Sequence, residues 1–290
     1  MSETIRIAND KLSVAVSPRG AETQSIMTSD GRSWLWNGDA EFWTGRAPIL
    51  FPIVGKAPDD TITIDGQPYT MKQHGFARKF GFRLAEHSDT VCRLELEADA
   101  RTKEIYPFDF RLSVAHVLEG ATLKVVSTVV NSGDKPMPFG FGYHPAFNWP
   151  MPGMNKGHVH HVHLENDAEP FMVRLRDGLI DLTPLPSPFS KGLLALDHDY
   201  FVDDAMIFPE GAGDRLTLSA EDGPALHFTF ENLPNLALWT KPGAPYICVE
   251  PWHGMAAAHG LGTELSARPS TKTLAPGEST DFTFTVTFDG

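Results

Sequence analysis

Hydrophobic and polar residues alternate in short runs along most of the chain. In residues 11–16 the apolar side chains of Leu12, Val14 and Val16 occupy every second position. A period of two places such side chains on one face of an extended strand. The same alternation marks further segments, namely residues 61–64, 92–98, 112–118, 123–130, 216–219, 225–230, 236–240, 246–250 and 279–288. The pattern predicts a protein built mainly of half-buried β-strands.

Glycine and proline separate these runs. The chain has 25 glycines and 23 prolines, which fall between short apolar segments at close, irregular intervals, as is typical of β-rich proteins. The strands expected at residues 112–118 and 123–130 are joined by residues 119–121 (EGA), which fit a hairpin turn. We predict one large antiparallel β domain over residues 1–290, made of two packed sheets.

Helical signals are few. Residues 40–43 fit one turn, and residues 252–259 fit a short helix at most, since Met255 and three alanines precede Gly260. Pro251 is expected to end the preceding strand, because proline cannot donate a backbone hydrogen bond to a neighbouring strand.

The charge balance argues against nucleic acids and anionic membranes as partners. With 24 Lys and Arg against 37 Asp and Glu, the formal net charge is −13, whereas nucleic acids and anionic membranes are bound by basic surfaces.

The most apolar stretch, residues 47–55, contains two prolines and is far shorter than the roughly 20 residues that span a bilayer. Residues 1–10 lack the basic start and apolar run of a signal peptide. Cys92 and Cys248 form no CxxC pair and fit reduced thiols. We expect a soluble cytoplasmic protein that binds neither nucleic acid nor membranes.

Three segments place a reactive side chain beside residues that constrain the backbone. His74 opens residues 74–78 (HGFAR), His144 stands between an aromatic residue and a proline, and Glu250 ends an apolar run. Each of them taken singly fits an ordinary structural role. Together, a carboxylate and two imidazoles at loop positions of a β scaffold supply the groups that general acid–base catalysis requires.

The order of these segments resembles that of the aldose 1-epimerases, also called galactose mutarotase-like proteins, and of a bacterial subgroup in particular. The resemblance includes residues 47–55 (APILFPIVG) and extends from residues 18–22 (PRGAE) to residues 274–278 (LAPGE), which is nearly the whole chain. It implies a large antiparallel β-sandwich, the supersandwich, that interconverts the α and β anomers of a free hexose. Opening a hemiacetal needs only proton transfers, so no metal, nicotinamide or other cofactor is expected.

The resemblance also implies roles for single residues. Glu250 matches the general base, His144 matches the general acid, and His74 matches the residue that binds near the ring oxygen and supports the acid. The substrate-binding arginine is either Arg46, in a Gly-Arg-Ala-Pro segment, or Arg78, which follows His74 closely. Both assignments remain open at the level of the sequence.

Further residues are expected to bind the sugar. Asp204 resembles the carboxylate that binds sugar hydroxyls, and the aromatic ring of Trp252 offers an apolar face to the pyranose. Lys241, together with the two candidate arginines, is available to bind a phosphate, because phosphate recognition needs cationic side chains. A hexose-6-phosphate 1-epimerase is therefore the close alternative, and a non-catalytic carbohydrate-binding or sugar-sensing protein on the same fold is another. The expected partner is a small sugar, and the expected assembly is a monomer or homodimer.

The proposed acid and base are expected to influence each other. A glutamate with an ordinary pKa near 4.3 is ionised at neutral pH, whereas a histidine near 6.5 is mostly neutral. A carboxylate close to His144 should raise the pKa of the imidazole and so supply a charged acid beside an ionised base, facing each other across the hexose.

One histidine cluster suggests a third class of function. One short segment contains His158, His160, His161 and His163. In a strand, His158 and His160 would share one face, and His161 and His163 the other. Histidines two residues apart can chelate zinc or nickel. No further ligands accompany them, so a solvated edge strand is the favoured interpretation over a metalloprotein.

Overall fold

The computed structural model describes residues 4–289 of the chain. Residues 1–3 and 290 lie outside the described part, so the expected domain of residues 1–290 and the N-terminal segment 1–10 are each covered only in part. None of the helices in residues 4–289 combines the length and the apolar character needed to cross a bilayer.

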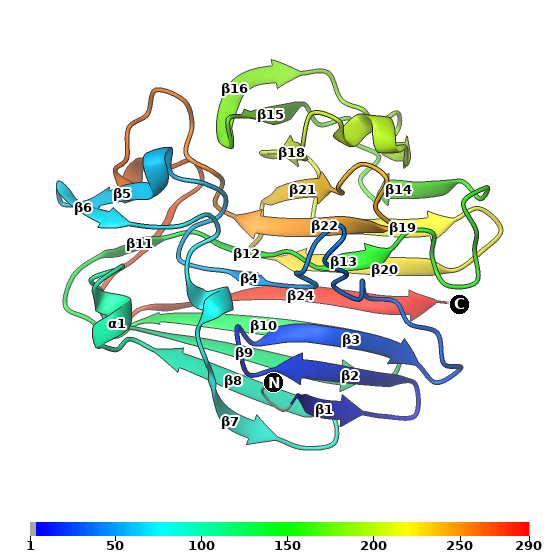
Figure 1. Ribbon diagram of the computed structural model, residues 1–290, viewed down its shortest axis with the longest axis horizontal. Coiled ribbons are helices and arrows are strands. Elements are labelled where there is room, and N and C mark those ends of the chain that lie inside the picture. The colour runs from blue at the N-terminus through cyan, green and yellow to red at the C-terminus, as the bar shows by residue number, and fades with distance from the viewer. Residues whose placement is uncertain (1–3, 290) are drawn as a thin grey trace.

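Two large antiparallel sheets dominate the structure (Figure 1). The nine-stranded sheet has the order β17 (Leu193–Ala195), β14 (His160–Leu164), β19 (Arg215–Ala220), β20 (Ala225–Glu231), β24 (Ser279–Asp289), β10 (Thr122–Asn131), β9 (Phe110–Glu119), β8 (Val91–Glu97) and β7 (Arg83–His87). The eight-stranded sheet has the order β16 (Leu179–Leu185), β15 (Met172–Arg176), β18 (Met206–Phe208), β21 (Asn235–Trp239), β22 (Tyr246–His253), β12 (Phe141–Tyr143) and β4 (Ile49–Leu50), and β13 (Ala146–Asn148) also pairs with β22.

Smaller elements complete the fold. One sheet contains β1 (Ile5–Ala8), β2 (Leu12–Ser17) and β3 (Glu22–Thr28), and two-stranded sheets pair β5 (Thr61–Ile64) with β6 (Gln67–Thr70) and β11 (Met137–Phe139) with β23 (Lys272–Leu274). The single α-helix in the described chain, α1 (Ala100–Lys103), is one turn long and begins with a capping box at Asp99. Four 3-10 turns occupy Pro58–Asp60, Ala77–Lys79, His198–Phe201 and Leu265–Ala267.

The main hydrophobic core lies between the two large sheets. Leu112 of β9 and Val125 of β10, from the nine-stranded sheet, belong to the same buried cluster as Ile247 and Val249 of β22. Alternation along β22 therefore points Ile247 and Val249 into the core, while Cys248 and Glu250 face the other side of the eight-stranded sheet. That outer face carries the candidate site.

The fold class predicted from alternation is confirmed, since almost all regular structure is antiparallel strand. The expected segments coincide with β2, β5, β8, β9, β10, β19, β20, β21, β22 and β24, and the hairpin at residues 119–121 joins β9 to β10. The short strands β4, β11, β12 and β13 were not predicted, because two or three residues are too few to show a period.

The single turn expected at residues 40–43 is present, since the Trp43 N–H donates to the Asp39 carbonyl (3.0 Å). Two other local expectations are wrong. Residues 252–259 continue as strand and then loop, with no helix. Pro251 does not end β22, which runs on to His253. The Val249 N–H donates to the Pro145 carbonyl, so position 251 faces the same side, where β12 and β13 are interrupted and a missing donor is tolerated.

Candidate active site

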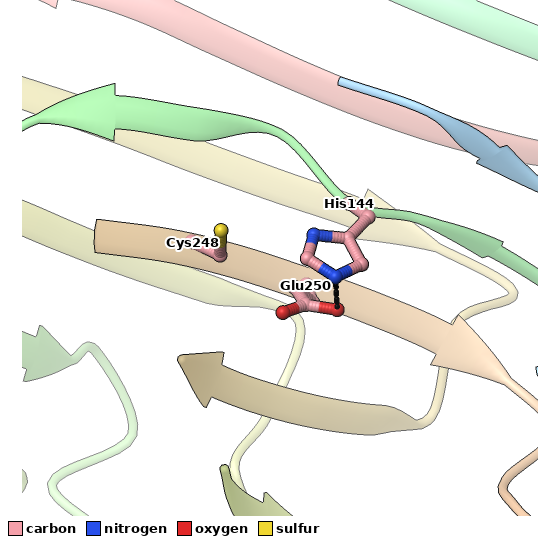
Figure 2. Close-up of side chains that lie close together, drawn as sticks. All are labelled: His144, Cys248 and Glu250. Atoms are coloured by element: carbon pink, nitrogen blue, oxygen red, sulfur yellow. Dashed lines mark ion pairs between the residues drawn. The ribbon is translucent and has the colours of Figure 1, made fainter. Parts of the chain in front are cut away.

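The pairing of three strands brings His144 and Glu250 together. β12 pairs Gly142 with Trp252, and β13 pairs Ala146 with Cys248. The register is the same on both sides of the interruption, so His144 stands opposite Glu250. Side chains opposite each other on one face of antiparallel strands are close neighbours. His144 Nε2 lies 3.2 Å from Glu250 Oε2, as Figure 2 shows.

This contact corrects one geometric expectation. His144 and Glu250 touch each other directly instead of facing each other across a space the size of a hexose. Both groups are buried, with exposed fractions of 7% for His144 and 2% for Glu250. A sugar in this site would therefore lie over the pair and contact both side chains from one side.

A tight turn brings His74 to the same place. His74 has a φ of 65° and Gly75 has a φ of 70°, so two consecutive residues adopt left-handed backbone conformations. The His74 N–H donates to the Gly55 carbonyl (2.9 Å), and the Gly55 N–H donates to His74 Nδ1 (3.1 Å). Because Nδ1 accepts a hydrogen bond, the neutral ring carries its proton on Nε2. The His74 and His144 rings meet edge to face, with centroids 5.5 Å apart.

A buried arginine that sequence analysis did not single out holds the wall beside His74. The Arg268 guanidinium donates to the carbonyls of Val54 (2.7 Å), Met255 (3.1 Å) and Lys56 (3.3 Å). These bonds fix the segment that contains Gly55, the hydrogen-bond partner of His74. Burial lowers the pKa of Arg268 to about 10.

A cavity of about 230 Å³ lies over these groups. The residues in its lining that were predicted from the sequence are His74, Arg78, His144, Asp204, Glu250 and Trp252. Its walls are completed by other residues, among them Gln73, Trp43 and Trp239. The structure thus brings together six of the eight residues predicted from the sequence.

Arg46 and Lys241 do not line this cavity. The Arg46 guanidinium donates to the Gln24 carbonyl (2.7 Å), and the Lys241 ammonium donates to the Glu41 carbonyl (3.2 Å) and lies over the Phe42 ring. The two candidate arginines are thereby distinguished, because Arg78 lines the cavity while Arg46 is used in the surrounding structure.

Two tryptophans that were not predicted as site residues enclose the imidazole of His144. Trp43 stacks on it with centroids 4.8 Å apart at 27°, and Trp239 meets its edge at 5.7 Å and 84°. Trp239 pairs with Cys248 in the register of β21 and β22. The strand pattern therefore predicts that Trp239 lies on a strand, but not that it contacts His144. Trp36 and Phe147, which are also aromatic and close in sequence to these segments, are buried away from the cavity.

Asp204 reaches the cavity from a left-handed backbone position. Its φ is 70°, and its Oδ1 accepts a hydrogen bond from the Ala205 N–H (2.8 Å). The Arg174 guanidinium donates to the carbonyls of Asp204 and Tyr200, both at 2.7 Å. Arg174 therefore stabilises the loop that presents Asp204, just as Arg268 stabilises the segment beside His74.

Burial sets the charge of the central pair. It lowers the pKa of His144 to about 3, and it raises the pKa of Glu250 well above its ordinary value, with the negative charge of Asp204 adding to the rise. The expectation that Glu250 raises the pKa of His144 is therefore not met, because burial has the largest influence on this pKa and lowers it. Burial thus penalises both the carboxylate and the imidazolium, so it favours the form of the pair in which both side chains are neutral. Burial likewise lowers the pKa of His74.

The solvated edge strand expected at residues 158–163 is wrong, because β14 lies between β17 and β19 in the nine-stranded sheet. His160 is buried, and its Nε2 accepts a hydrogen bond from the Met151 N–H (3.1 Å). His158 precedes β14 instead of sharing a strand face with His160, and His163 Nε2 lies 3.1 Å from Asp167 Oδ1.

Comparisons with known proteins agree on the relationship. The sequence model of the family described as Aldose 1-epimerase matches residues 3–287. Two LacX proteins of Lactococcus lactis subsp. lactis, one chromosomal and one plasmid-encoded, are each 31% identical to this chain over 98% of its length and 99% of theirs. The structure of a galactose mutarotase related enzyme from Lactobacillus acidophilus matches with a TM-score of 0.93 and 30% identity, covering 99% of this chain and 98% of that one. A galactose mutarotase-like protein from Lactobacillus casei matches with a TM-score of 0.89 and 29% identity, covering 99% and 100%.

Proposed function

Because this chain belongs to the aldose 1-epimerase family, we propose that it interconverts the α and β anomers of a free hexose. The observation that carries the proposal is the contact between His144 and Glu250 at a cavity whose other polar groups include His74, Arg78 and Asp204. An imidazole and a carboxyl group that share one proton can exchange protons with two oxygens of one small molecule.

The reaction begins with a proton shift inside the pair. Moving the shared proton from Glu250 to His144 across their 3.2 Å contact creates a carboxylate and an imidazolium without any proton from solvent. The carboxylate then accepts the proton of the anomeric hydroxyl O1, and the imidazolium donates its proton to the ring oxygen O5 as the C1–O5 bond breaks. Rotation about C1–C2 presents the other face of the aldehyde, and the reverse transfers close the ring.

The remaining cavity residues orient the sugar. The Nε2–H of His74 can support the departing ring oxygen, since Nδ1 is occupied by Gly55, and the Gln73 side-chain amide lies 3.3 Å from this Nε2. Arg78 and Asp204 offer a cation and a carboxylate to the sugar hydroxyls, and Trp252 offers an aromatic surface. Well-placed proton transfers of this kind typically contribute about 10²–10⁴ each to the rate.

Polarimetry on freshly dissolved α-galactose or α-glucose tests the proposal. We expect the protein to speed the approach to the equilibrium rotation, and expect Glu250→Gln and His144→Asn each to lose at least about a hundredfold in kcat. Glu97→Gln is the matched control, because Glu97 is exposed at the end of β8. A Glu250→Gln protein that folds and keeps near-normal kcat would show that the base is assigned wrongly. A wild-type protein that binds the sugar without accelerating the change would indicate a sugar-binding protein.

A hexose 6-phosphate is the second candidate substrate. A groove next to the cavity shares Trp43 and Arg78 with it and adds the cations of Arg19 and Lys79, which can bind a phosphate, together with the carboxylate of Glu22. Repeating the polarimetry with the 6-phosphates decides between the substrates, because a free-sugar enzyme should have the higher kcat/KM on the unphosphorylated hexose.

A further inference from the structure

Cys248 lies beside the catalytic pair and has no part in the proposed reaction. It precedes Glu250 by two residues on β22, so both side chains lie on the same face of the strand (Figure 2). The thiol is fully buried and unpaired with any other cysteine in the described chain. A thiol next to an imidazole and a carboxyl group is a set of side chains that can act together as metal ligands.

The three side chains are close enough to share one ion. One donor atom each from His144, Cys248 and Glu250 lie within 4.8 Å of one another, and all three residues are buried. Zinc binds thiolate at about 2.3 Å and imidazole or carboxylate at about 2.0–2.2 Å, so donors of a tetrahedral site stand roughly 3.5 Å apart. The widest observed spacing has to close by roughly 1.3 Å to reach the tetrahedral value, which side-chain rotation can provide.

Two buried polar atoms at this place are not fully satisfied. Within residues 4–289, His144 Nδ1 has no hydrogen-bond partner, and Glu250 Oε2 meets only His144 Nε2, at 3.2 Å and without the geometry of a hydrogen bond; both side chains are more than nine-tenths buried. Buried polar groups in proteins are almost always satisfied, so each exception needs an explanation. Figure 2 shows one ring nitrogen of His144 facing Glu250 and the other on the side where Cys248 lies.

We propose that His144, Cys248 and Glu250 form a binding site for a thiophilic divalent cation such as Zn²⁺, which inhibits the enzyme. The bound ion takes up both groups that must exchange protons with the sugar, and the thiol releases its proton on binding. The inhibition rests on the proposed epimerase function, whereas the binding of the ion does not.

Spectroscopy with Co²⁺ tests the binding without reference to activity. A thiolate bound to Co²⁺ gives a charge-transfer absorption in the near ultraviolet, and this chain has two cysteines. We expect one equivalent of Co²⁺ to produce the band in the wild-type protein and in Cys92→Ser, and expect Zn²⁺ to displace it. Cys248→Ser and Cys248→Ala should lack the band. Absence of the band in the wild type, or its persistence in both Cys248 variants, would overturn the proposal.

Zinc titration of the polarimetric assay tests the inhibition. We expect Zn²⁺ to suppress wild-type and Cys92→Ser activity, and a chelator to restore it. The Cys248 variants should keep their basal activity and need at least about tenfold more Zn²⁺ for half-inhibition, since the loss of even an outer partner of a metal ligand costs roughly 10–100-fold in affinity. Equal sensitivity of folded Cys248→Ala and wild type would overturn the proposal, while a protein without epimerase activity leaves the Co²⁺ result as the deciding measurement.

Discussion

Burial penalises the carboxylate of Glu250 and the imidazolium of His144 alike, so it favours a resting pair in which both side chains are neutral. A sugar that donates its O1 hydroxyl to Glu250 and accepts from His144 would favour the charged arrangement. The pair is thus inactive when it holds two protons and when it holds none, and the rate should be bell-shaped in pH.

The charge of Asp204 is expected to influence the pH range in which the rate is highest. Its negative charge raises the pKa of Glu250, second to burial, so Asp204→Asn should move both limbs of the kcat/KM profile to lower pH. The same change should raise KM about tenfold, because a hydrogen bond to a charged group contributes about 1.5–3 kcal/mol. Asparagine tolerates the left-handed φ of this position, so the backbone is not disturbed.

Polarimetric rates across a pH series measure both effects. Asp203→Asn is the matched control, because Asp203 is the neighbouring carboxylate but does not line the cavity. An Asp204→Asn profile that is unshifted, or shifted to higher pH, would contradict the influence of Asp204 on Glu250.

The turn after His74 shows how a single element positions a site residue. At Gly75 an added Cβ would stand 2.1 Å from the Phe51 carbonyl oxygen, a contact that the backbone must move to relieve. Gly66 has a similar φ of 76°, yet a Cβ there would meet nothing within 4 Å. Comparing the two positions separates the effect of crowding from that of a left-handed backbone.

We expect Gly66→Ala to cost about 1–2 kcal/mol of unfolding free energy, the cost of a left-handed residue with a side chain. Gly75→Ala should cost at least about 2 kcal/mol more, and should also lower kcat because His74 shifts with the turn. Denaturant titration of both variants, together with polarimetry, measures the difference. Equal losses of stability in the two variants would show that crowding against Phe51 has no part in fixing the turn.

Elements with a clear period were predictable, and those without one were not. β9 and β10 alternate over ten residues each, so their strands and hairpin follow from the sequence. β12 and β13 have three residues each, and the break between them, which holds His144, shows no pattern.

The residue types of the candidate site were predictable, but its geometry was not. Chemistry and family resemblance single out His74, His144 and Glu250, but only the register with β22 places His144 opposite Glu250. The choice between Arg46 and Arg78 likewise depends on where the loops run in space.

At the scale of the whole molecule, buried histidines should make the fold sensitive to acid. Burial lowers the pKa of His116 to about 4 and of His144 to about 3, both below the ordinary value of 6.5. Between these lowered pKa values and 6.5, the unfolded chain binds more protons than the folded chain. The contribution of these histidines to stability is therefore fully present above about pH 6.5 and is lost as the pH falls toward 4.

His116 offers a test away from the cavity. It is buried in β9 without a partner for Nδ1 in the described chain, and it borders a small internal space with Leu123, Val125 and Phe284. His116→Leu should remove roughly 3 kcal/mol of the stability loss between pH 7 and pH 4, since one pKa unit corresponds to about 1.4 kcal/mol. Denaturant midpoints of His116→Leu, His161→Leu and wild type over this range measure it. A decline as steep in His116→Leu as in wild type would assign the acid sensitivity to other groups.

The proposed acid and base, His144 and Glu250, lie on or between strands in the middle of a sheet, whereas Arg78 and Asp204 reach the cavity from a 3-10 turn and a loop. Changes of sequence in those two segments leave the ladder that joins β22 to β12 and β13 intact. Exchanging residues there can therefore alter which sugar is accepted while the proposed acid and base stay in place. Duplicated genes for such a protein can come to encode enzymes with different sugar preferences that keep the same proposed reaction.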